Sequence, residues 1–273
     1  MSNKQSEDKR FTAHTAAPST RDAGAPLILA LDSATGAGGV AVARGAELLA
    51  HRLGGARGGH SSALLSEIDA VLREAGVSVR DIELFAVACG PGSFTGLRAG
   101  LATVKAFATI RRAPITPVPT LHAVAASAGP SAATVAAIPA GRGEVFAQLL
   151  SVREDLRVTE LSEPVHVQPQ TLVRMAHNWY FDLLTWTGEG AHLNRELILE
   201  AAASRTASTG GNGDRGGAEE PRAWRLTESR MTNLESITRL GLISFGGGSF
   251  VASEELGAIY VRPSDAELGE RRG

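Results

Sequence analysis

The stretch GPGSFTGLR (Gly90–Arg98) decides how the chain folds around it. A run of apolar residues, Leu84–Cys89, leads into it, and a helical pattern rich in small residues, Ala99–Ile110, leads out. A short apolar run, a glycine-rich turn and a helical period in this order predict a strand, a tight turn and a helix.

The turn has two interpretations. Gly90 and Gly92 allow a close backbone approach, and Ser93 is a suitable N-cap for the helix. The free N–H groups at the start of a helix attract anions, so the turn could hold a phosphate, or it could be only a compact crossover. It is not a Walker A loop, because Leu97 follows Gly96 where that motif requires lysine.

Composition narrows the class of protein. The chain has 273 residues, 43% of them hydrophobic and 21% charged, and a net charge of −2, which is typical of a globular protein with no electrostatic affinity of its own for nucleic acid. The single cysteine, Cys89, lies in an apolar run and is expected to be a buried, unreactive thiol. No apolar run is long enough to cross a membrane and no signal peptide is evident, so we expect a cytoplasmic protein without a membrane partner.

The order of elements predicts an α/β protein of two lobes. Residues 1–25 are expected to form a disordered extension and residues 26–119 the first lobe, with three strands followed by alternating helices and strands. Residues 120–262 are expected to form the second lobe, which contains a low-complexity loop at 204–221, and residues 263–273 a charged tail.

An acidic residue ends the first predicted strand. Asp32 follows the buried run Leu27–Leu31 and precedes a turn that contains Gly36, Gly38 and Gly39. A carboxylate beside a glycine-rich hairpin can build a metal–phosphate site, and an aspartate in this position can equally cap its own turn.

Two helices of the first lobe carry distinctive faces. The helix that begins near His60 has Leu64 four residues later, where a second histidine would be needed to share a metal ion. In the helix after Ser93, Gly96 and Gly100 are four residues apart on one face. Glycine in a helix costs about 1 kcal/mol, so another helix, a ligand or a partner chain is expected to pack closely there.

Several segments together resemble the bacterial TsaB (YeaZ) family. They are Ile28–Val42, His60–Leu72, Gly90–Ala108 and Arg142–Leu150, with a weaker match at Ala258–Arg262. The resemblance implies the two-lobed actin-like ATPase (ASKHA, RNase H-like) fold, with mixed sheets flanked by helices.

The resemblance also implies a function. It implies a subunit that is non-catalytic on its own and essential to the complex that adds threonylcarbamoyl to the adenosine next to the anticodon of ANN-reading tRNAs. Such a subunit dimerizes with and activates its paralogue TsaD, works alongside the ATPase TsaE, and meets tRNA only through the complex. A homodimer is the alternative when the chain is alone. TsaD carries a metal-binding His-x-x-x-His, of which this chain has only His60.

The resemblance assigns two sets of residues. A vestigial phosphate site, with no required cofactor and at most weak ATP or ADP binding, would comprise Asp32, Gly38, Gly90, Gly92 and Ser93. The surface for TsaD would comprise His60, Ala63, Leu64, Gly96, Leu97 and Gly100.

Two other functions remain open at this level. One is an active actin-like ATPase or phosphotransferase that uses Asp32 and the glycine turns. The other is a glycoprotease-like peptidase built on Ser93, His60 and Asp32.

Overall fold

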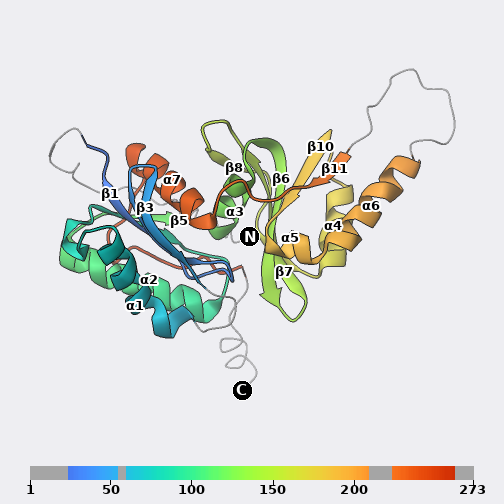
Figure 1. Ribbon diagram of the computed structural model, residues 1–273. Coiled ribbons are helices and arrows are strands. Elements are labelled where there is room, and N and C mark those ends of the chain that lie inside the picture. Colours follow the sequence, from blue (N-terminus) through green and yellow to red (C-terminus); the bar gives the residue numbers. More distant parts are fainter. Residues whose placement is uncertain (1–23, 55–59, 209–222, 262–273) are drawn as a thin grey trace, which may run out of the picture.

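A computed structural model describes residues 24–54, 60–208 and 223–261. The predicted extension (1–25), loop (204–221) and tail (263–273) lie wholly or mostly outside these residues. The described chain forms two β-sheets with helices on their outer faces and two further helices between them (Figure 1). This agrees with the predicted two-lobed α/β arrangement.

The first sheet has five strands in the order β3-β2-β1-β4-β5. They are β1 (Leu27–Asp32), β2 (Gly39–Arg44), β3 (Glu47–Leu53), β4 (Leu84–Ala88) and β5 (Ile115–Val118). The first three form an antiparallel meander, while β4 and β5 run parallel to β1. Every residue of β1 and β4 is buried, which is expected for apolar strands covered on both faces.

Helices α1 (His60–Glu74) and α2 (Phe94–Arg111) cover the outer face of the first sheet. A single turn of 3-10 helix, η1 (Val79–Asp81), lies between α1 and β4. The core on this side is made of large aliphatic side chains from both helices and from the sheet, among them Leu29, Leu31, Val40, Val42, Leu64, Ile68, Phe85, Leu101 and Val104.

The second sheet repeats the strand order of the first. Its order is β8-β7-β6-β10-β11, with β9 paired to β7. The strands are β6 (Ser131–Gly141), β7 (Glu144–Val152), β8 (Val158–Glu160), β9 (Val165–Val167), β10 (Leu183–Thr187) and β11 (Ala223–Leu226). Helices α4 (Pro169–His177), α5 (Glu189–Leu193) and α6 (Arg195–Ser208) cover its outer face around the buried Trp186.

Each of the two remaining helices packs on the sheet that it does not directly follow in the chain. Helix α3 (Thr120–Ala128) follows the last strand of the first sheet but packs on β6 and β7 of the second. Helix α7 (Asn233–Gly246) follows the last strand of the second sheet but packs on β1, β4 and β5 of the first. The two helices also contact each other, so they form a shared middle layer between the sheets (Figure 1).

This packing changes the predicted division of the chain. The sequence assigned residues 120–262 to the second lobe, whereas α7 lies against the first sheet. Val251 also forms a bridge with Ile115, and the Ile259 N–H donates to the Cys89 carbonyl at 2.7 Å. The order of elements along the chain did not predict that α7 packs on the first sheet, because α7 follows the last strand of the second sheet.

Helix α7 approaches the first sheet closely at Gly241. A Cβ at this position would lie 2.6 Å from the Ala86 Cβ of β4 and 2.8 Å from the Thr116 hydroxyl oxygen of β5. Contacts this short do not occur between real side chains. The helix can therefore lie this close to the sheet only because residue 241 is glycine and has no Cβ.

We predict that Gly241→Ala lowers the free energy of unfolding by about 1–3 kcal/mol, because the added methyl group overpacks the contact with β4. Gly246→Ala is the matched control, since a Cβ at the exposed end of the same helix meets nothing within 4 Å. Urea denaturation measures both variants. Equal stability of the two would show that the close approach at Gly241 does not constrain the fold.

Candidate functional site

The turn at Gly90–Arg98 is held by hydrogen bonds within the chain. The Gly90 N–H donates to the Thr120 hydroxyl at 3.1 Å, and the Ser93 N–H donates to the Ala34 carbonyl at 2.8 Å. The Ser93 hydroxyl accepts from the Gly96 N–H at 3.2 Å, so the predicted N-cap is confirmed. These bonds tie the turn to the end of β1 and to the start of α3.

The glycines of the turn face the chain's own backbone. A Cβ on Gly90 would overlap the Ile259 carbonyl oxygen, and a Cβ on Gly92 would overlap the Ala34 carbonyl oxygen. Carbonyl oxygens are acceptors, so they do not complement a phosphate. These contacts explain the glycines without a ligand and so favour the compact crossover over the anion site.

Asp32 caps its own turn. One carboxylate oxygen accepts from the Ala34 N–H at 2.9 Å and from the Thr35 N–H at 3.2 Å. The other accepts from the Thr35 hydroxyl at 2.7 Å and from the Asn233 side-chain amide of α7 at 3.3 Å. The side chain is buried and both oxygens are engaged, which supports the structural interpretation of Asp32.

The second lobe presents a carboxylate to the same turn. Glu189, at the start of α5, lies so close to Gly36 that a Cβ there would be 3.2 Å from its carboxylate oxygen. Gly38 is needed because a Cβ would overlap the Asp32 carbonyl oxygen. Neither Glu189 nor Asn233 was predicted from the sequence to belong to this site. The run Gly188-Glu189-Gly190 was the available signal for the first.

The face of α2 that carries Gly96 and Gly100 packs against the residues at the end of β1. A Cβ on Gly96 would overlap the Ser33 carbonyl oxygen, and a Cβ on Gly100 would overlap the Ser33 hydroxyl oxygen and lie 3.1 Å from a methyl group of Leu31. Leu97 is also buried, at 1% exposure. The close neighbour inferred from these glycines is thus the end of β1, and their assignment to a partner surface is wrong.

The residues of α1 that were assigned to the partner surface differ in their exposure. Leu64 is 4% exposed and belongs to the core between α1 and the first sheet, while Ala63 is exposed. His60 begins α1, but its side chain lies outside the described part of the molecule. Of the six residues assigned to a partner surface, Ala63 is thus the one whose described side chain is exposed.

Other residues form the exposed apolar face of these helices. Ala102, Ala106 and Ile110 recur every four residues along α2 and are exposed, Ile110 at 78%. We call these three residues the α2 stripe. In α1, Leu65 is 62% exposed. Large exposed aliphatic side chains on neighbouring helices are typical of a surface that meets another protein.

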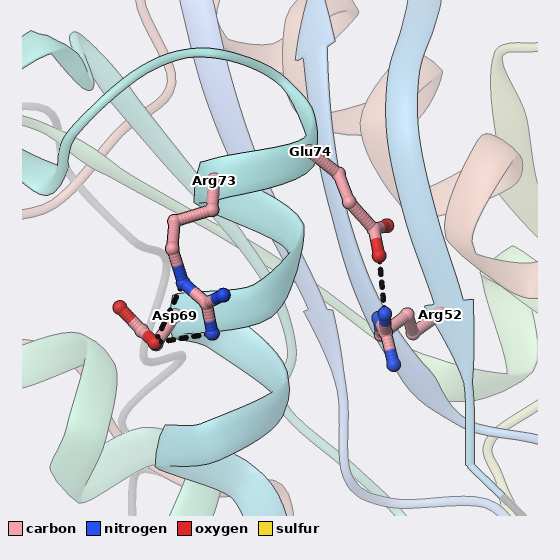
Figure 2. Close-up of polar contacts among 4 residues, drawn as sticks. All are labelled: Arg52, Asp69, Arg73 and Glu74. Atoms are coloured by element: carbon pink, nitrogen blue, oxygen red, sulfur yellow. Dashed lines mark hydrogen bonds and ion pairs between the residues drawn. The ribbon is translucent and has the colours of Figure 1, made fainter.

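The far end of α1 is polar instead. Arg52 of β3 forms an ion pair with Glu74, and Arg73 contacts Asp69 one helical turn earlier at 2.8 Å (Figure 2). All four side chains are exposed, so these pairs stabilise the fold little. Their position restricts the apolar part of the α1 surface to its first half.

The first turn of α2 carries an aromatic contact with the C-terminal segment. The Arg98 guanidinium lies 4.1 Å from the centre of the Phe94 ring. The centres of the Phe94 and Tyr260 rings are 5.8 Å apart. Tyr260 is 47% exposed. The segment that closes the turn through Ile259 therefore also contacts the first residue of α2.

The remaining candidate nucleophile is inert. Cys89 is 1% exposed, and burial raises the pKa of its thiol to about 12, which confirms the predicted buried cysteine. Among the residues the structure describes, no three His, Cys, Asp or Glu side chains are grouped so that they could hold a metal ion. Those same residues include no helix long and apolar enough to span a membrane.

Comparison with known proteins points to one family. The model of the family "TsaD: tRNA N6-adenosine threonylcarbamoyltransferase" matches residues 54–181. The protein named TsaB from Haemophilus influenzae is 34% identical over 134 residues, which are 48% of this chain and 56% of that protein. TsaB from Escherichia coli is 35% identical over 122 residues, or 44% of this chain and 52% of that protein. The chain thus spans about half the length of the curated relatives it matches.

Solved structures agree on the fold. YeaZ from Pseudomonas aeruginosa superimposes with a TM-score of 0.66 at 23% identity, covering 86% of this chain and 99% of that one. The resemblance to the TsaB (YeaZ) family is confirmed. The predicted actin-like α/β fold, with two mixed sheets flanked by helices, is confirmed with it.

We predict that Asp32→Ala lowers the free energy of unfolding by about 2–3 kcal/mol, because it leaves buried N–H groups of Ala34 and Thr35 without an acceptor. Asp69→Ala removes an exposed carboxylate and is the control, with an expected change within about 0.5 kcal/mol. Chemical denaturation gives both values. Wild-type stability of Asp32→Ala would argue against the capping role.

Proposed function

We propose that this chain is a TsaB-like subunit in the biosynthesis of threonylcarbamoyladenosine in tRNA, non-catalytic on its own, and that it acts by dimerizing with and activating a TsaD protein. The names of the Haemophilus and Escherichia relatives support the pathway. The observation that carries the pairing is the α2 stripe, an exposed apolar face on a helix whose opposite face is fixed to β1.

The α2 stripe suits contact between helices. Ala102 and Ala106 are small, and the distance between two packed helices is shortest where the side chains at the contact are small. Ile110 of α2 and Leu65 of α1 offer larger apolar side chains. A partner that covers either side chain would remove it from water, which is worth about 2 kcal/mol for a fully buried side chain.

The proposed role requires no cofactor. The glycines that resembled a phosphate site approach the chain's own carbonyl oxygens, and Asp32 is engaged by its own turn. We include TsaE as a further component of the complex, and tRNA as a substrate that the complex binds, because a net charge of −2 gives this chain no electrostatic attraction for it.

The pairing is tested with a double substitution on the α2 stripe. Ala106→Arg/Ile110→Arg should abolish co-purification with the TsaD of the same organism, because two guanidinium groups would have to be buried without partners. The matched control is Leu193→Arg/Leu199→Arg on α5 and α6, where both leucines are exposed, and it should co-purify normally.

Reconstituted tRNA modification provides the second readout. We expect modification to require the wild-type chain together with TsaD and to be lost with the α2 variant only. Circular dichroism establishes that both variants are folded. Normal co-purification of Ala106→Arg/Ile110→Arg would refute this surface, and modification without the chain would refute the function. If the isolated chain is a dimer that the α2 variant dissociates, the same face also pairs with a second copy.

A further inference from the structure

A cavity of about 410 Å³ lies between the lobes, among β5, α3, α7 and the turn from β7 to β8. Its apolar wall is built by Pro117 and Val118 of β5 and by Leu240 and Ile243 of α7. Arg153 and Arg157 line it from the second lobe. The volume and the mixture of an apolar wall with a few charged groups are typical of sites for small molecules.

The two arginines share one weak counter-ion. The Asp155 carboxylate lies 3.6 Å from Nε of Arg153 and 3.4 Å from Nε of Arg157, both longer than a hydrogen bond. One oxygen of this carboxylate also accepts from the Arg157 backbone N–H at 3.2 Å. None of the described residues that line the cavity is acidic. The two guanidinium groups are therefore the only charged side chains among the described residues of the lining, while the Asp155 and Glu160 carboxylates lie beside it.

The turn that carries the arginines is fixed in place. The Arg153 N–H donates to the Arg157 carbonyl at 3.0 Å, which brings the two residues side by side. Leu156 between them has a φ of 61°, a left-handed conformation that is strained for a residue other than glycine. Its side chain packs against the core between α3 and the second sheet, and this burial offsets the strain.

His122 contributes a neutral polar group to the same cavity. Its ring Nε2 lies 3.0 Å from a Glu160 carboxylate oxygen. Burial lowers the pKa of His122 below its ordinary value, with Glu160 acting in the opposite direction, so the imidazole is uncharged at neutral pH. The positive charge of the cavity thus comes from the two arginines.

We infer that this cavity is a binding site for a small molecule that carries a carboxylate or phosphate group on an apolar body. Arginine pairs with both acids through two parallel hydrogen bonds. The acid group meets Arg153 and Arg157, and the apolar body lies against Pro117 and Ile243. Such a ligand contacts both lobes at once and stabilises their relative placement. This site is independent of the proposed pairing with TsaD.

The test uses the full-length, ¹⁵N-labelled chain and three small probes. Phenyl phosphate, benzoate and the neutral benzyl alcohol are titrated while amide chemical shifts are recorded. We expect at least one of the two anions to shift the amides of residues 153–159 and 243–249 in a saturable way, and benzyl alcohol to leave them unchanged. The tighter of the two anions identifies the preferred acid group.

Two variants separate the charge from the shape of the site. Arg153→Glu/Arg157→Glu, at two exposed side chains, should weaken binding of the anion at least about tenfold, and Ser244→Phe should do the same by filling the cavity. Arg174→Glu on α4 is the control and should bind normally. The inference is overturned by saturable binding that survives the double substitution, by equal binding of benzyl alcohol, or by the absence of shifts with both anions.

Discussion

The end of β1 is the point on which the arrangement of the first lobe depends. Ser33 follows the strand and passes directly beneath α2, with no side chain of the helix between it and the helix backbone at Gly96 and Gly100. Glycine at positions 96 and 100 permits this contact. Because the inner face of α2 is held in this way, the direction of its outer face is fixed as well, and the α2 stripe is presented on a rigid support.

The sequence predicted the local structure well where one short pattern was sufficient. The strand, turn and N-cap around Ser93 followed from residue types and spacing. A pattern of small residues shows that something approaches closely, but not what approaches. The glycines of α2 were therefore assigned to a partner, whereas Ser33 of the same chain fills the space.

The features that the sequence did not predict depend on contacts between residues far apart in the chain. Asp32 could not be interpreted from its neighbours alone, because one of its hydrogen-bond donors, Asn233, lies 201 residues away in α7. Glu189 meets the turn at Gly36 only because the two lobes face each other. The common cavity of Arg153 and Arg157 exists only once α3 and α7 have formed its other walls.

The packing of α3 and α7 has a consequence for the order in which the chain is made. The inner face of the first sheet remains open until the ribosome has passed residue 246, which at about 5–20 residues per second takes on the order of ten seconds after β5 is complete. During that time the inner face of the nascent sheet is exposed to water. Most of its side chains are alanines (Ala30, Ala41, Ala43, Ala86 and Ala88), with Ile28, Leu84 and Val118 among them. Leucine, valine and phenylalanine dominate the other face, which α1 and α2 cover early. The face that is covered last is thus made mostly of alanines, which expose little apolar surface and so form few non-native hydrophobic contacts.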